Sequence, residues 1–348
     1  MAVEVFDIVM LIFPLLIILI ACELFTNGIE WLGLKLGLAE SATGSILAAV
    51  GTALPETIVP IIAIFFAGSS AGDDIAVGAI LGAPFMLATL AMLVGGIAVL
   101  VAHRKGRRPA ELAVSEAHMS FDIKSFMIAY TVAFVAALLL PGEGGINQII
   151  RSVLAVFLLI LYIVYVMRMI KAPSKSGEEP EALYFIRAFS GNRDRQPSTF
   201  AVAVQVVAAL GLIIVGAKIF VSGIEAVSAD LGIPNIILAF LIAPIATELP
   251  EKFNSVLWYW RGKDTLALGN ITGAMVFQSS IPVSIGLVLT NWTLAPINIA
   301  SMLFAMGAIS LLYMEMRVWK TISYKSLMLS GSFYIVYVAL IFLFPSLT

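Results

Sequence analysis

The segment GTALPE at residues 51–56 returns as ATELPE at residues 246–251, and each copy places a glutamate directly after a proline inside an apolar run. These copies are part of a longer duplication, because residues 21–56 align without gaps on residues 216–251. Apolar segments often resemble one another by chance, but a shared Pro-Glu and shared glycines at fixed spacing are not expected by chance. The chain therefore contains an internal repeat.

The composition indicates an integral membrane protein. Hydrophobic residues make up 61% of the 348 residues and charged residues only 12%, whereas a soluble domain has about 25% charged residues. The net charge of -2 and the lack of a basic stripe argue against a nucleic-acid partner. Cys22 is the one cysteine, which excludes an intrachain disulfide. No basic residue precedes the first apolar run, so we interpret it as a retained helix rather than a secretory signal.

Continuous apolar runs of about 20 residues predict membrane-spanning helices and not a sheet. We expect an all-α protein of about ten transmembrane helices, near residues 7–28, 41–68, 75–102, 121–140, 147–170, 199–225, 235–259, 265–290, 294–314 and 325–346.

Basic residues gather in every second turn between these spans, with Arg151 as the exception. The clusters are His103 to Arg108, Lys171 to Arg195, Arg261 with Lys263, and Arg317 with Lys320. Because Lys and Arg stay on the cytoplasmic side, these turns are predicted to face the cytoplasm and both termini to face outward. We expect a multi-pass protein of the cell membrane.

The repeat divides the chain into two halves. We predict a first repeat over residues 1–170, a cytoplasmic linker over 171–198 with no regulatory role, and a second repeat over 199–348. Residues 73–83 also align on residues 264–274, after a short length difference. Five spans in each half place the second half upside down relative to the first, and inverted repeats are typical of secondary transporters.

Glu56 and Glu251 are the central candidates for a binding site. An ionised carboxylate in hydrocarbon costs at least a few kcal/mol, so each must face a cavity, a partner or an ion. The alternative is an ion pair with a basic residue such as Lys218 or Lys252. The occurrence of a glutamate at both equivalent positions favours ion ligation.

The prolines before these glutamates predict local breaks in both helices, because proline cannot donate to the helical ladder. Free carbonyl groups and the hydroxyl groups of Thr52 and Thr247 would then lie beside the carboxylates. Hard cations such as calcium take six to eight oxygen ligands of these kinds.

Two pairs of glycines, Gly78 with Gly82 and Gly269 with Gly273, are spaced four residues apart. This spacing is typical of close helix packing in membranes, which would bring a neighbouring helix up to the carboxylates.

These motifs resemble those of the cation/calcium exchanger superfamily, the sodium/calcium and proton/calcium antiporters. That family has two inverted repeats, each with a G-T-S-L-P-E-like segment followed by a G-N-x-x-G-S-N-x-F-N/D-like segment. The stretch from Leu36 to Glu40 and the Gly-Ile-Glu turns at Gly28 and Gly223 are also similar. The resemblance implies the ten-helix fold and an antiport cycle.

The sequence departs from the family pattern at three positions. The family's ligating Asn or Asp falls on Leu87 in the first repeat, which cannot bind an ion, and on Gln278 in the second, which offers an amide oxygen. Glu248 stands where the family usually has Ser. We therefore expect a cation site made by Glu56, Glu251, Thr52, Thr247, Glu248 and Gln278.

We interpret the chain as a secondary antiporter that exchanges a divalent cation, expected to be calcium, for sodium or protons by alternating access. The alternative on the same fold is a channel or an uncoupled uniporter. The partners are inorganic cations and the lipid bilayer, with no cofactor. An intramembrane enzyme is not expected, because His103 and His118 lie in or near a basic loop and no HExxH motif is present.

The first repeat offers few oxygen ligands, since Ala79, Ala83 and Leu87 occupy its second segment. Sodium-coupled relatives need several small oxygen-lined sites, whereas clustered carboxylates take up protons readily when the metal is absent. This difference favours protons over sodium as the counter-ion.

Overall fold

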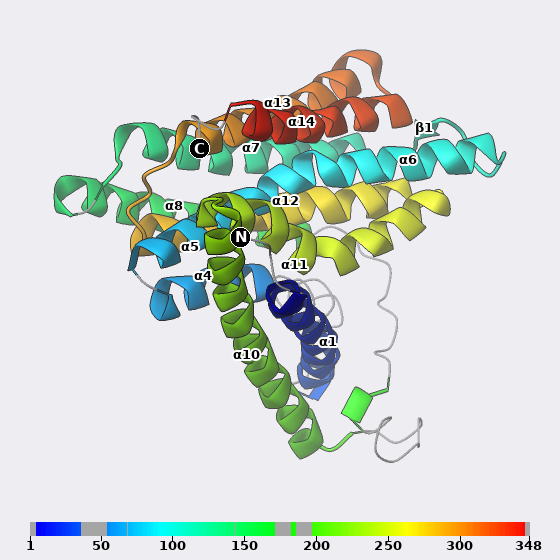
Figure 1. Ribbon diagram of the computed structural model, residues 1–348. Helices are drawn as coiled ribbons and strands as arrows, with labels where there is room; N and C mark the ends of the chain where they lie inside the picture. Colours follow the sequence, from blue (N-terminus) through cyan, green and yellow to red (C-terminus); the bar gives the residue numbers. More distant parts are fainter. Residues whose placement is uncertain are drawn as a thin grey trace.

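The computed structural model describes residues 5–35, 54–67, 69–142, 144–170, 182–185 and 197–344, and nearly all of this part is helical (Figure 1). The main elements are α1 (Val5–Lys35), α4 (Leu54–Phe66), α5 (Ser69–Ala88), α6 (Leu90–Arg104), α7 (Glu116–Leu139), α8 (Gly145–Ile170), α10 (Thr199–Leu231), α11 (Asn235–Trp260), α12 (Asp264–Leu289), α13 (Pro296–Trp319) and α14 (Tyr324–Leu343). Two short strands, β1 (Glu111–Leu112) and β2 (Ile322–Ser323), pair antiparallel at one end of the bundle.

In the described part of the chain, eight helical spans are long and apolar enough to cross a membrane. One of them, Ala71–Arg104, joins α5 and α6 around Thr89, whose hydroxyl donates to the Phe85 carbonyl at 2.6 Å. The apolar helices Glu56–Phe66 and Asn235–Ile245 are shorter. The predicted spans thus correspond to these helices, although residues 41–53 of the second predicted span lie outside the described residues.

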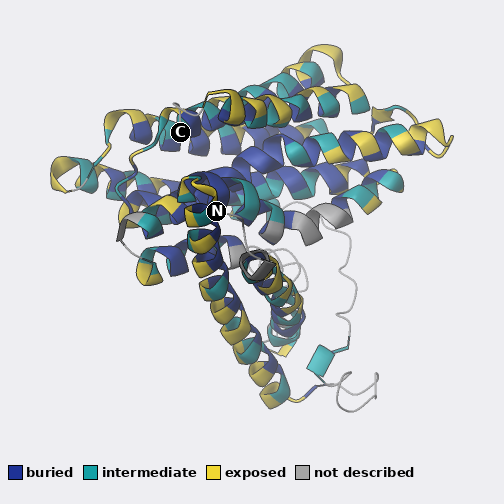
Figure 2. Cartoon of the chain, viewed as in Figure 1, coloured by how far each residue is buried: buried dark blue, intermediate teal, exposed yellow. Residues whose placement is uncertain are grey.

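Large apolar side chains cover the outside of the bundle. On α8, Ile146, Val153 and Ile160 stand seven residues apart and are 68%, 64% and 54% exposed. Figure 2 shows exposed positions along the outer faces of α8 and α10. A surface of this kind is expected against lipid, where exposed apolar area has no hydration cost.

Helices α1 and α10 pack against each other as an antiparallel pair, apart from the main stack of helices (Figure 1). A Cβ added to Gly28 of α1 would lie 2.8 Å from Val206 of α10, and a Cβ added to Gly223 of α10 would lie 2.6 Å from the Met10 carbonyl of α1. Gly28 and Gly223 are equivalent positions of the repeat. Two equivalent helices that pack antiparallel are what inverted repeats require. The prediction of Gly-Ile-Glu turns here is wrong, because both glycines lie inside long helices.

Helices α5 and α11 approach each other through glycine. A Cβ on Gly78 would clash with the Ile236 carbonyl, and a Cβ on Gly82 would clash with the Phe240 carbonyl. Pro244 cannot bond that second carbonyl from four residues later, so a close Cα–H contact from Gly82 suits it. Close packing is therefore confirmed at Gly78 and Gly82.

The second glycine pair has more space around it. No described atom lies within 4 Å of a Cβ built on Gly269, and the Tyr165 hydroxyl is 3.4 Å from one built on Gly273. Close packing at this pair stays a prediction.

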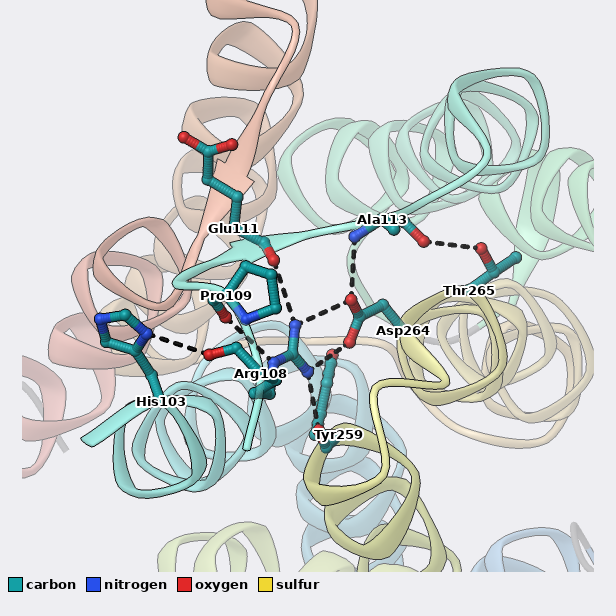
Figure 3. A network of polar contacts seen from close by, with 8 residues as sticks. All are labelled: His103, Arg108, Pro109, Glu111, Ala113, Tyr259, Asp264 and Thr265. Atoms are coloured by element: carbon teal, nitrogen blue, oxygen red, sulfur yellow. Dashed lines mark hydrogen bonds and ion pairs between the residues drawn. The ribbon is translucent and has the colours of Figure 1, made fainter. Parts of the chain in front are cut away.

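A buried ion pair fastens the turn after α6 to the start of α12 (Figure 3). Arg108 donates to both carboxylate oxygens of Asp264, at 2.5 and 2.8 Å, and to the carbonyl of Tyr259 at 2.7 Å. Asp264 also accepts the backbone N–H of Ala113 at 2.8 Å. We call this end of the bundle, with its turns 103–108, 261–263 and 317–320, the basic end.

One described piece of the predicted linker, residues 182–185, contacts the α1–α10 pair. The backbone N–H groups of Tyr184 and Phe185 donate to the side-chain oxygens of Asn27 at 3.1 Å and Gln205 at 2.9 Å. Gln205 in turn donates to Asn27 at 3.0 Å. The rest of the predicted linker and its bounds lie outside the described residues.

We expect Arg108→Ala to lower the unfolding free energy of the purified protein by about 3–5 kcal/mol, because it leaves the Asp264 carboxylate buried without its counter-charge. Arg317→Ala is the matched control. It removes an ion pair to Glu116 whose side chains are 45% and 41% exposed, which costs less than about 1 kcal/mol. Thermal unfolding in detergent measures both, and equal effects would contradict the burial argument.

Candidate cation-binding site

Glu56 lies in the first turn of α4 and is buried, with 6% of its surface exposed. Helix α4 packs against α5, α10, α11 and α12, so this carboxylate faces the protein interior rather than lipid. Thr52 lies outside the described residues, and so does Gly51. A role of Thr52 as a cation ligand is therefore a proposal.

Helix α11 carries the second candidate, Glu251, and packs against α4. It is continuous from Asn235 to Trp260, so the predicted helix break at Pro250 is wrong. The proline still has no N–H, and the carbonyl of Ala246, four residues earlier, receives no helical hydrogen bond from it. A continuous helix can thus keep one free carbonyl. Glu251 lies on this helix, but its side chain lies outside what the structure describes.

The predicted residues Glu248 and Gln278 come together between α11 and α12. Gln278 Nε2 donates to Glu248 Oε1 at 2.9 Å, and the two residues are 2% and 1% exposed respectively. Gln278 Oε1 is buried without a hydrogen-bond partner among the described residues. The pair therefore presents a negative carboxylate and an amide acceptor inside the membrane, which is a suitable beginning for a cation site.

Thr247 is also buried, and its hydroxyl donates to the Ala243 carbonyl of the same helix at 3.1 Å. The hydroxyl hydrogen is used within α11, while the oxygen keeps lone pairs for a cation. This geometry is compatible with the predicted role of Thr247 as a cation ligand.

The position of the first repeat that is equivalent to Gln278 is apolar. Leu87 is fully buried in the hydrophobic core. Nearby, the ring of Phe85 lies 5.3 Å from that of Phe240 and 4.6 Å from that of Tyr337. The side chains of Leu87 and Phe85 supply no oxygen ligand, as predicted for Leu87.

Helix α12 supplies more hydroxyl groups than the sequence analysis considered. Ser279 and Ser280 follow Gln278 and are fully buried, and the Ser280 hydroxyl has no hydrogen-bond partner among the described residues. Two adjacent serines inside an apolar span could have indicated these buried hydroxyl groups from the sequence. Among the described side chains, which do not include Glu251, no three His, Cys, Asp or Glu residues form a group that could hold a metal ion.

The alternative partner for the glutamates, Lys218, points elsewhere. Its Nζ lies 5.3 Å from the ring centre of Phe66, and Phe66 is about 15 Å along α4 from Glu56. This position argues against a Lys218–Glu56 pair. Lys252 has an undescribed side chain.

A cavity of about 500 Å³ opens at the end of the bundle opposite the basic end. Its lining includes Asp73, Asp74, Thr290 and Asn291, and the Asn291 N–H lies 3.4 Å from an Asp73 oxygen. Ile64 of α4 also lines it, about 12 Å along that helix from Glu56. The sequence analysis used Asp73 only to align the repeats, although two adjacent acids at a span boundary can attract cations.

With this arrangement described, a comparison with known families identifies the class of protein. The family model described as "Sodium/calcium exchanger protein" matches residues 6–171 and 201–343. The chain belongs to this family. It is therefore a membrane protein of a cation/calcium exchanger family and not of an enzyme family, which confirms both predictions.

Two curated relatives cover most of the chain at low identity. CaxA of Alkalimonas amylolytica is 22% identical over 309 residues, which are 88% of each protein. Membrane protein MJ0091 of Methanocaldococcus jannaschii is 21% identical over 273 residues, which are 78% of each.

Two solved structures share the fold. The H⁺/Ca²⁺ exchanger CAX matches 97% of this chain and 82% of its own with a TM-score of 0.71 and 15% identity. The sodium-calcium exchanger NCX_Mj, in a crystal soaked with 10 mM Na⁺ and no Ca²⁺, matches 96% and 98% with a TM-score of 0.56 and 20% identity. The predicted architecture is confirmed: an all-α membrane protein of about ten transmembrane helices with inverted repeats.

We expect Gln278→Leu to weaken the stabilisation of the purified protein by calcium, with an apparent affinity loss of about tenfold, or 1.4 kcal/mol. The substitution removes the buried amide oxygen and leaves Glu248 without its donor. A ligand that binds only the folded protein raises its melting temperature, so calcium titrations followed by thermal unfolding measure the change.

The matched control for this experiment is Ser284→Ala on the same helix. Its hydroxyl is bonded to the Ser280 carbonyl at 2.7 Å. The two variants should differ clearly in calcium dependence. An unchanged calcium response in Gln278→Leu would remove Gln278 from the site.

Proposed function

We propose that this chain is a secondary antiporter that carries a divalent cation, calcium, in exchange for protons by alternating access. The observation that carries the proposal is the buried Glu248–Gln278 pair on α11 and α12, in a bundle where α4 holds the buried carboxylate of Glu56. Carboxylates persist inside a membrane when an ion or a proton compensates them.

The site consists of Glu56, Glu251, Glu248, Thr247, Thr52 and Gln278. Its oxygen ligands are carboxylates, hydroxyls and one amide, which are the hard donors that calcium prefers. Both exchangers of known structure that share the fold transport calcium according to their names, and this supports calcium as the divalent substrate.

The α1–α10 pair is the group of helices that moves. These two helices pack mainly on each other, and their contacts with the rest of the bundle run mostly through α4 and α11, the helices that carry the carboxylates. A sliding or rocking of the pair exposes the site first to one end and then to the other, as in other inverted-repeat transporters.

The basic end faces the cytoplasm, and both termini face outward, in agreement with the distribution of Lys and Arg. The acidic cavity with Asp73 and Asp74 then opens to the outside and concentrates cations near α4. The membrane is the cell membrane. Residues 1–170 and 199–348 form the two repeats, with 171–198 as the linker.

Protons are the counter-ion because the oxygen ligands are unevenly distributed. Leu87, Ala79 and Ala83 of α5 supply none of the hydroxyl and amide groups that several sodium ions need. A cluster of carboxylates can instead hold protons when calcium leaves, so calcium and protons compete for the same oxygens.

We expect Glu56→Gln and Glu251→Gln each to abolish calcium uptake into proteoliposomes, because each removes half of the central charge. Glu248→Ala should reduce uptake less, since the family usually has a serine there. Glu116→Gln, which alters an exposed carboxylate of α7, is the control and should leave uptake unchanged. Full uptake with both Glu56 and Glu251 neutralised would refute the proposed site.

A second experiment separates the counter-ions. We expect a proton gradient, in sodium-free buffer, to drive calcium uptake, and a sodium gradient at clamped pH to drive none. Sodium-driven uptake without a response to the proton gradient would make sodium the counter-ion. Calcium flux without either gradient would indicate a channel or a uniporter.

A further inference from the structure

A second buried carboxylate lies away from the predicted cation site, between α7, α8 and α12. Asp122 of α7 is 2% exposed. Its Oδ1 accepts the hydroxyl of Tyr165 of α8 at 3.0 Å, and its Oδ2 accepts the hydroxyl of Thr272 of α12 at 2.7 Å. None of these residues is part of the proposed calcium site.

No Lys or Arg of the described residues compensates the charge of this carboxylate. Among the described residues, no Lys or Arg forms an ion pair with Asp122. Arg168 of α8 lies instead over the ring of Phe121, with its guanidinium carbon 5.3 Å from the ring centre. A buried carboxylate in a membrane without a cation beside it is a functional group by default.

The other titratable groups around Asp122 leave one route for a proton. On α8, Tyr162 stacks beside Tyr165, and α12 contributes the non-titratable Thr272. On α13, Tyr313 lies near Lys124, a different part of α7. His118, one helical turn from Asp122 toward the basic end, is exposed and can exchange protons with water.

The Thr272 hydroxyl has several acceptors within reach but only one hydrogen, and the two nearest acceptors are Asp122 and Leu268. Its oxygen lies 2.7 Å from Asp122 Oδ2 and 3.1 Å from the Leu268 carbonyl of its own helix. When Asp122 is ionised, the hydroxyl donates to the carboxylate. When Oδ2 carries a proton, Asp122 donates to Thr272, and the Thr272 hydrogen turns to Leu268.

This arrangement satisfies both protonation states without moving a heavy atom. A purely structural carboxylate would need to be satisfied in one state only. We propose that Asp122, with Tyr165 and Thr272, is a proton-binding site that opens to the basic end of the molecule through His118. The site stands on the geometry of α7, α8 and α12 and does not depend on calcium transport.

Proton binding at Asp122 affects α12, the helix that carries Gln278. Thr272 precedes Gln278 by six residues on α12, and the switch changes which partner its hydroxyl bonds. A proton from the basic end thus changes the hydrogen bonding of α12 at a position separate from the calcium ligands.

Infrared difference spectroscopy tests the site directly, on the full-length protein in detergent between alkaline and mildly acidic pH. The wild type should gain a carbonyl band of a buried carboxylic acid on acidification. Asp122→Asn should lose this one band, and Glu116→Gln, an exposed carboxylate of the same helix, should keep it. Identical buried bands in the wild type and in Asp122→Asn would overturn the proposal.

Thr272→Val provides a second variant that keeps the carboxyl group. Valine is similar in shape to threonine but cannot accept a hydrogen bond from the protonated Asp122 carboxyl group. The carbonyl band of Asp122 should therefore persist at a higher frequency. An unmoved band would overturn the proposed switch even if Asp122→Asn fails to fold. Because no transport is measured, these results are independent of whether the chain exchanges calcium for protons.

Discussion

A charge inside hydrocarbon must be compensated by a partner, and most of the described polar structure follows from this constraint. Water is absent from the core of a bilayer, so each buried ionisable group needs a counter-charge, a hydrogen-bond donor or a bound ion. The chain uses these solutions at different places in the bundle. Arg108 neutralises Asp264 at the basic end, two hydroxyls hold Asp122, and Gln278 donates to Glu248. The last kind differs from the first, because a neutral amide donor leaves the carboxylate without a fixed counter-charge from that donor, and an oxygen ligand of this kind suits a hard cation.

The same constraint explains which parts were predictable from sequence. Long apolar runs predict membrane helices, and glutamates repeated at equivalent positions within them predict buried polar sites in duplicated halves, so the class, the helices and the burial of Glu56 were predictable from sequence. Leu87 could be recognised as a lost ligand from its side chain alone. The pairing of Glu248 with Gln278 needed the structure, because contacts between α11 and α12 depend on rotation of both helices about their axes.

Other features could not be read because local rules were overridden by packing. Pro250 predicted a helix break, but α11 is continuous from Asn235 to Trp260, because the loss of one helical hydrogen bond is tolerated in a packed bundle. Gly28 and Gly223 were interpreted as turns, yet they serve as contact points inside helices. Asp122 was overlooked because its span was predicted to begin at residue 121, which made it a boundary residue. The helix begins at Glu116, which places Asp122 in the second turn and buries it.

The crossing of α1 and α10 has the form of an isologous interface. Gly28 meets the partner helix as Gly223 does, so the contact is self-complementary in the way of a twofold dimer. The chain carries a dimer interface within one polypeptide, and this contact does not distinguish one end of the molecule from the other. A preference between the ends must come from parts that break the symmetry. The Arg108–Asp264 ion pair at the basic end and the docking of residues 182–185 on Asn27 and Gln205 are two such parts, because neither belongs to the symmetric contact.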